Sequence, residues 1–189
     1  MRNSCFRWLL IFFVVGFNAP RALGQTEDQN LKDFFKLYLD ESFQLRPMQA
    51  TEMGDHRFDA QLEDLSAEGR ARWLQLTRAT LASLPKRVDY TKLSRDSQID
   101  YEILEHSLKT EEWLTDNMHP FEEDPRVYGG YINDSTYLLL TQSSLPLETN
   151  VANCIARMAL IPKVVAAARQ NLKNPPRVHT ETAIRQNRG

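Results

Sequence analysis

The spacing of apolar side chains predicts that helices dominate this chain. Residues 28–45 carry apolar groups at intervals of three and four positions, which is the pattern of one face of a helix. Arg46-Pro47 breaks this pattern, because proline does not fit a helix interior. Residues 48–53 can form one or two further turns before Gly54, which suits a helix C-terminus.

Two longer helices are predicted after a polar loop over residues 54–65. Ser66 is a suitable N-cap for a helix that runs to about Leu84 and ends at Pro85. A further helix is predicted from about Ser94 to 116. The buried stripe expected for the first of these two helices comprises Trp73, Leu74, Leu76, Thr77, Leu81 and Leu84.

The middle of the chain gives a weaker pattern. Residues 119–133 contain two prolines and a Gly-Gly pair, so we expect a non-helical segment there. Residues 135–141 form a short apolar run that fits either a helix or a strand. The helical pattern returns over residues 148–172, where Pro162 is expected to kink the helix or divide it into two.

The last predicted helix is entered near Thr180 and reaches the final residue. We therefore expect the chain to be the front portion of a longer protein. The fold class is all-α, an irregular array of helices, since no convincing strand pair or repeat occurs. Several helices have apolar residues on more than one side, and such faces are normally covered by further helices.

The first 24 residues match a secretory signal peptide. Arg2 and Arg7 precede or flank an apolar run from Trp8 to Phe17, and small residues stand at Ala22 and Gly24. A membrane-spanning helix would need about 20 apolar residues, roughly twice this run. We predict cleavage after Gly24, with secretion or delivery to the periplasm and no stable membrane insertion afterwards.

Removal of the leader changes both the charge and the cysteine content. The leader takes three arginines and no acidic residue, so 23 basic against 25 acidic residues become 20 against 25, a net charge of -5. This balance argues against nucleic acid as a partner, because that needs clustered Lys and Arg. Cys154 is left without a cysteine partner, and at an apolar helical position it is expected to be a small core residue.

Short motifs occur in a fixed order along the rest of the chain. They are Tyr38-Leu-Asp-Glu41; Pro47-x-x-Ala50-Thr51-x-x-Gly54-Asp-His-Arg57-x-Asp59; Leu93-Ser94 with Ile99-Asp100-Tyr101-x-Ile-Leu104; Arg157-x-x-x-Ile161-Pro162; Ala168-Arg-x-Asn171-Leu172-x-x-Pro175-Pro176; and Ala183-Ile184-x-Gln186. In order and spacing they resemble the N-terminal part of the bacterial domain-of-unknown-function family 885. The resemblance spans nearly all of residues 25–189.

The resemblance implies an exported, mostly helical protein similar to zincin-type metallopeptidases. Its zinc site would lie in a C-terminal half, on a His-Glu dipeptide with a second histidine downstream. The four histidines here are followed by Arg57, Ser107, Pro120 and Thr180, so this chain has no such dipeptide. We therefore expect no catalytic residue, metal site or cofactor in this chain, with zinc only in the missing C-terminal half, which would also be its main partner.

Two polar segments are candidate sites. Asp55, His56, Arg57 and Asp59, with Asp64 nearby, could form a proton shuttle or a weak metal site. We favour a structural role, in which these side chains satisfy loop backbone groups and pair with one another, because one histidine with oxygen ligands lacks the usual zinc set.

The second segment is Tyr128-Gly129-Gly130-Tyr131. Its glycines permit close backbone approach and its tyrosines can bind at their edges, so it could line a substrate cleft. A turn with two packing aromatic rings is an equally good interpretation.

The functional hypothesis is an exported scaffold and cleft wall of a metallohydrolase, inactive by itself. A free-standing secreted helical module that binds a partner protein is the alternative from another class. A decayed reading frame without function is the third.

The leader gives a direct test of export. Leu10→Arg interrupts the apolar run, so this variant is expected to stay in the cytoplasm and keep its leader. Fractionation and the mass of the mature chain measure this outcome. Normal export and processing of Leu10→Arg would show that residues 1–24 are not the export signal.

Overall fold

The computed structural model describes residues 26–141 and 143–188, so the predicted leader lies outside the described residues. The first half comprises α1 (Glu27–Leu45), α2 (Pro47–Glu52), the short 3-10 turn η1 (His56–Phe58), α3 (Ala67–Arg87), η2 (Tyr90–Lys92) and α4 (Arg95–Asn117). The second half comprises α5 (Pro120–Glu123), α6 (Pro125–Thr141), α7 (Leu147–Asn171) and α8 (Arg177–Gln186). The described residues contain no strand, so the all-α prediction is confirmed.

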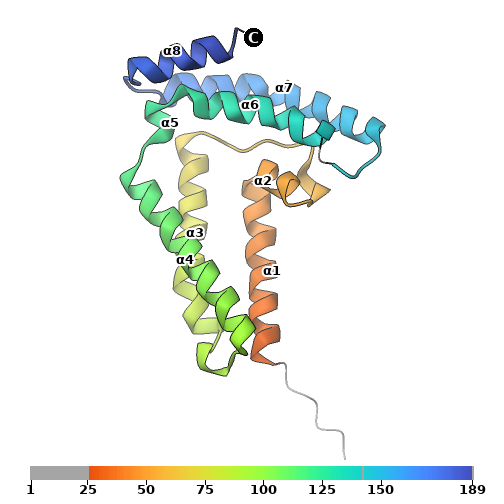
Figure 1. Ribbon diagram of the computed structural model, residues 1–189, viewed down its shortest axis with the longest axis vertical. Coiled ribbons are helices and arrows are strands. Elements are labelled where there is room, and N and C mark those ends of the chain that lie inside the picture. Colours follow the sequence, from red (N-terminus) through yellow and green to blue (C-terminus); the bar gives the residue numbers. More distant parts are fainter. Residues whose placement is uncertain (1–25, 142, 189) are drawn as a thin grey trace, which may run out of the picture.

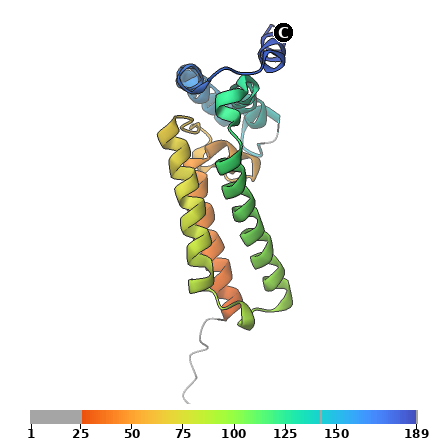
Figure 2. The ribbon, with the colours of Figure 1, turned by 90° about the vertical axis from the view of Figure 1, so that its left-hand side faces the viewer.

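The helices form two groups, and one group lies across the end of the other (Figure 1). The long helices α1, α3 and α4 run side by side, whereas α6, α7 and α8 lie across one end of them (Figure 1). Figure 2 shows the second group stacked above the three-helix group, with α2 and the loop after it in the junction. The junction is therefore built from a short segment of the chain, residues 46–66.

Each group has its own buried apolar cluster. In the three-helix group the cluster is Leu31, Phe34, Leu84, Val88, Leu93 and Tyr101. In the second group Leu65 from the junction packs with Tyr128 of α6 and with Val164 and Ala167 of α7. Leu65 thus connects the junction to the core of the second group.

Local signals set the helix boundaries as the sequence indicates. Ser66 accepts a hydrogen bond from Gly69 N at 3.1 Å, and Ser94 accepts one from Ser97 N at 3.4 Å. Each serine thereby satisfies one of the free N–H groups in a first turn. Gly54 has φ of +81°, a conformation that side chains with a Cβ disfavour.

Residues 119–133 correct the sequence prediction, because most of them are helical. Pro120 and Pro125 each occupy the first position of a helix, where the missing N–H costs nothing. The pair Gly129-Gly130 lies inside α6, whose packing on α7 outweighs the poor helix propensity of glycine. The alternative of a Gly-Gly turn is therefore wrong.

The structure decides two alternatives that the sequence left open and moves two helix boundaries. The run 135–141 is the last part of α6 and not a strand. Pro162 lies within α7 without dividing it, and Pro85 lies within α3, which continues to Arg87. The last helix, α8, begins at Arg177, three residues before the expected entry.

Gly69 and Gly129 offer matched tests of glycine within helices. A Cβ on Gly69 would lie 2.0 Å from the backbone oxygen of Asp64, whereas one on Gly129 meets nothing within 4 Å. Gly69→Ala is expected to lower the free energy of unfolding by about 1–3 kcal/mol through overpacking. Gly129→Ala should raise it by about 0.5–1 kcal/mol. Urea unfolding followed by far-UV circular dichroism measures both, and equal effects would contradict the close approach at Gly69.

Candidate functional site

The predicted polar loop lies at the junction of the two helix groups. Asp55 caps the 3-10 turn by accepting from Arg57 N at 3.1 Å, and Arg57 Nη2 donates to Asp55 and to Asp40 of α1, each at 2.6 Å. The hydrogen bond from the Arg57 guanidinium is the largest influence that lowers the pKa of Asp55. These contacts are of the kind expected for a structural role, which stays a prediction.

Asp59 is the buried member of this loop. Its side chain is 1% exposed and accepts a hydrogen bond from Thr51 Oγ1 at 2.7 Å. His56 Nδ1 lies 2.9 Å from the other carboxylate oxygen. Asp64, which the sequence places near this cluster, instead accepts from Ser66 N and pairs with Arg72 at the start of α3.

Arg157 of α7 completes the buried centre, and the sequence analysis did not find it. The residue is 0% exposed. Its guanidinium donates to Gln61 O at 3.0 Å, Ser135 O at 3.1 Å, Pro47 O at 3.4 Å and Thr51 Oγ1 at 2.6 Å. Burial lowers the pKa of Arg157, and the charge of Asp59, 4.0 Å away, opposes that shift.

Ser144 was also missed, because it lies 88 positions from His56 in the sequence. Its hydroxyl is 3.4 Å from His56 Nε2, and His56 in turn contacts Asp59. This order of contacts is that of the serine, histidine and aspartate in a catalytic triad. The charge of Asp59 is already engaged by Thr51 and by the nearby Arg157. These contacts of Asp59 agree with the structural role predicted for the loop, which stays a prediction.

The second predicted segment is split between the core and a cavity. Tyr128 is buried, and its hydroxyl donates to Phe121 O at 2.7 Å and accepts from Asn171 Nδ2 at 3.0 Å. Burial raises the pKa of Tyr128. Gly130 and Tyr131 line a cavity of about 370 Å³ between α2 and α6, whereas Gly129 does not.

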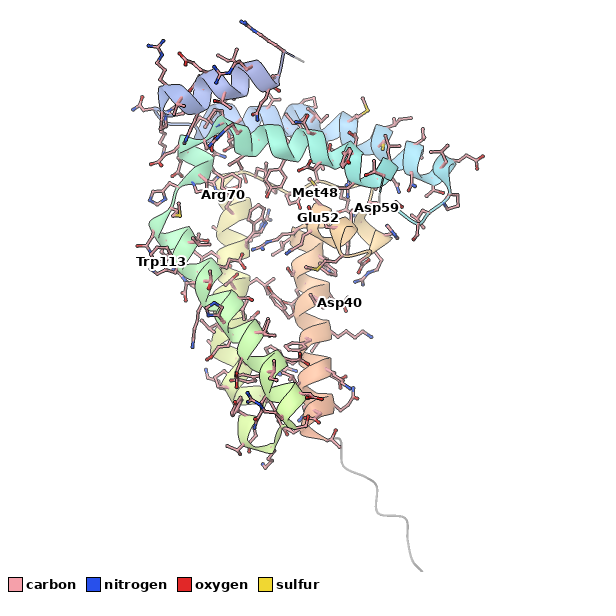
Figure 3. All side chains as sticks on the ribbon, viewed as in Figure 1. Asp40, Met48, Glu52, Asp59, Arg70 and Trp113 are labelled. Atoms are coloured by element: carbon pink, nitrogen blue, oxygen red, sulfur yellow. The ribbon has the colours of Figure 1, made fainter. Side chains whose placement is uncertain are left out.

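We call this cavity the α2–α6 pocket. Figure 3 shows Met48 and Glu52 on α2 close to Asp59 and beneath α6, where the pocket lies. The lining residues are Arg46, Met48, Gln49, Glu52, Glu63, Val127, Gly130, Tyr131 and Asp134. The pocket therefore joins the junction to one side of α6.

Glu63 has the most perturbed carboxylate of this pocket. It is 7% exposed, and its Oε1 accepts from Met48 N at 2.9 Å at the start of α2. Burial raises the pKa of Glu63, although the backbone hydrogen bonds and the charge of Arg157 oppose that shift. Burial and the charge of Glu63 in turn raise the pKa of Tyr131.

The described residues were also searched for metal ligands and membrane-spanning helices. No group of three His, Cys, Asp or Glu side chains lies together as a metal site would require. Helix α7 is long and apolar enough to cross a membrane by length and composition, but the core helices of packed proteins pass the same criterion.

These features define an all-helical protein with a polar junction between two helix groups. Residues 47–189 match the model of a family described as bacterial protein of unknown function (DUF885). The match covers more than half of the chain, so the chain belongs to this family. The resemblance noted in the sequence is confirmed. No curated protein matches the chain.

A solved structure is similar in fold and in sequence. It is that of a "putative lipoprotein of unknown function" from Shewanella oneidensis, which is 30% identical with a TM-score of 0.75. The similarity covers 84% of this chain and 29% of that protein. This chain thus spans less than a third of the length of the structure that it matches.

The Arg157 centre can be tested against an exposed arginine. Arg157→Met removes one donor from each of three carbonyl groups and takes the buried positive charge away from Asp59. We expect a loss of about 3–5 kcal/mol in the free energy of unfolding. Arg78 makes three hydrogen bonds, to Glu112 and Asp116, but its side chain is half exposed. Arg78→Met should therefore lower the free energy of unfolding by less than about 1 kcal/mol. Urea unfolding of both variants measures the two losses in the free energy of unfolding. Similar losses would refute the role given to Arg157.

Proposed function

We propose that this chain is the exported helical scaffold and cleft wall of a larger metallohydrolase of its family. Three observations support the proposal. The chain belongs to a bacterial family, it spans 29% of a longer relative, and that relative is described as a lipoprotein, a class of exported protein. The leader-like residues 1–24 agree with export.

The observation that carries the proposal is an apolar face on α6 and α7. Leu147, Val151, Ile155 and Met158 follow one another along one side of α7, and all are exposed. Tyr137 and Leu140 of α6 are exposed beside them and share with Met158 a groove of about 780 Å³. We call these six residues the α6–α7 face.

A contiguous apolar surface of this kind is unusual on a monomer and marks an interaction site. The family supplies one occupant for it, since the matched structure is much longer than this chain. We therefore infer that further polypeptide of the same protein covers the α6–α7 face. The α2–α6 pocket, with Gly130 and Tyr131, would then form part of a cleft wall.

The residues that the structure describes do not fit a zinc site. His56 has Asp59 and Ser144 as its neighbours, and no group of three suitable ligands occurs among the residues that the structure describes. Zinc chemistry would therefore belong to polypeptide outside this chain. No catalytic step is assigned to the residues present.

The alternative function is a self-sufficient secreted module that binds a partner protein. One observation favours it, namely the separate buried cluster of α1, α3 and α4, which needs no contribution from the second helix group. In that case the α6–α7 face would be the binding surface. The behaviour of the isolated chain distinguishes the two functions.

The α6–α7 face predicts how the purified chain behaves. The chain should aggregate, or keep its helical circular dichroism while binding a hydrophobic dye. Met158→Lys should lower the dye fluorescence clearly more than Met53→Lys. The two methionines are 56% and 62% exposed, but only Met158 belongs to the face. A monodisperse monomer with a sharp cooperative melt and no dye binding would contradict the scaffold function and favour the module.

A further inference from the structure

The α2–α6 pocket contains two buried acceptor atoms that lack a donor. Gln49 Oε1 and Glu63 Oε2 are inaccessible to solvent and have no hydrogen-bond partner. Both side chains line this pocket. A buried acceptor without a donor loses its hydration and regains nothing, so each such atom in a folded protein calls for an explanation. Here the shared pocket points to a donor that comes from outside the chain.

The charges around the pocket leave an excess of negative charge. Arg46, the basic lining residue, pairs with Glu111 and lies over the ring of Trp73 at 5.3 Å, so its charge is already engaged. No ion pair is found for Glu52 or Asp134 among the described residues. The pocket therefore favours a cation that donates hydrogen bonds.

The buried centre next to the pocket has the same imbalance. Arg157 is the nearest buried cation, and it faces two buried carboxylates, Asp59 and Glu63. Its Nη2 atom bonds to Thr51 and lies 4.0 Å from Asp59. Glu63 therefore shares its nearest buried cation with Asp59.

We propose that the α2–α6 pocket binds a primary ammonium group through Glu63 and Gln49. An ammonium carries three N–H donors and no acceptor, so it can bond to both open oxygens at once. Val127 and Tyr131 provide the apolar wall for the carbon atoms attached to the nitrogen, and the ring of Tyr131 can attract the cation. This site is argued from the pocket alone and does not rest on the proposed scaffold function.

Other cations fit the pocket less well. A guanidinium carries five N–H donors and so needs more acceptors than an ammonium, whereas only two oxygens are open here. A metal ion needs several ligands gathered at one point, and no group of three suitable side chains occurs in residues 26–141 and 143–188. The volume of about 370 Å³ lies near the lower end of the ~300–1,000 Å³ typical of ligand pockets. A small amine or the amino-terminal residue of a peptide is of this size.

Two pairs of ligands test the ammonium chemistry. Saturation-transfer NMR at low protein concentration and near-neutral pH compares ethylammonium with tetramethylammonium, which has the same charge and no N–H donor. Ethylammonium should bind at least about tenfold more tightly than tetramethylammonium. Ala-Ala-amide compared with its N-acetylated form extends the test to a peptide amino terminus. Binding of either free amine supports the site, and the tighter of the two identifies the source of the group.

Two variants of the pocket and two matched controls locate the site. Glu63→Gln keeps an acceptor for Met48 N but removes the charge, and Gly130→Leu places a side chain where a Cβ on the glycine meets nothing within 4 Å. Each should weaken ethylammonium binding at least about tenfold. Glu68→Gln removes an exposed charge, and Gly129→Leu makes the same helix substitution outside the pocket. Both controls should leave the affinity within about twofold of the unmodified protein.

Several results would overturn the proposal. The first is equal binding of ethylammonium and tetramethylammonium, which would show a charge effect without hydrogen bonds. The second is unchanged affinity in both Glu63→Gln and Gly130→Leu. The third is no binding by the unmodified protein, which would mean that no amine donor reaches the two open acceptors. Gly130→Leu keeps the test valid even if Glu63→Gln does not fold, because leucine raises the helix propensity at this position.

Discussion

The buried guanidinium of Arg157 is the contact on which the meeting of the two helix groups depends. Its four hydrogen bonds reach three separate parts of the chain: the start of α2, the loop at Gln61 and the middle of α6. A buried charge is costly unless its hydrogen bonds are satisfied, and any shift of α7 against α2 would break several of them together. The angle between the two groups is therefore fixed by a polar centre and not by apolar packing alone.

The same centre sets the electrostatics of the α2–α6 pocket. Glu63 is held in place by the backbone of Met48, so its carboxylate remains buried whether or not a cation is present. Arg157 lowers the pKa of this group, but desolvation is the larger effect and raises it. Because the shared cation also faces Asp59, the geometry that stabilises the junction leaves one carboxylate short of positive charge.

The sequence predicts features that depend on neighbouring residues and misses those that depend on distant ones. The cap at Ser66, the helix start near Ser94 and the end at Gly54 follow from residues close by in the sequence, and the structure has them. The helical conformation of residues 125–133 is different, because there the packing of α6 against α7 overrides two glycines.

The buried stripe of α3 shows the same limit. Thr77 and Leu84 are buried as expected, but Trp73 is only partly covered. Periodicity identifies a helix face, while its burial depends on how the partner helices cross it.

The candidate site could be predicted only in part for the same reason. The loop sequence singles out His56 and Asp59, whose contact spans three residues. Arg157 is 106 positions from Thr51, and no local pattern connects them. One signal was present, because a lone arginine in an apolar helical stretch must be either exposed or bonded within the core. Glu63 gave no comparable signal, since a carboxylate in a polar loop is ordinarily solvated.

Helix α7 has its polar and apolar sides in an unusual arrangement. Half of its buried residues are polar, whereas Ile155 and Met158 on the other side are exposed. The buried polar residues are Asn150, Arg157 and Asn171, and they stand beside the buried apolar residues Cys154, Val164 and Ala167. In a typical surface helix the apolar groups face the core and the polar groups face water. The buried polar residues are satisfied by specific hydrogen bonds, so the inner side is in its proper environment. The outer side has no such partners among the described residues. If apolar polypeptide covered the outer side, both sides of α7 would be in suitable surroundings. The longer relative shows that the family has additional polypeptide that could supply such a cover.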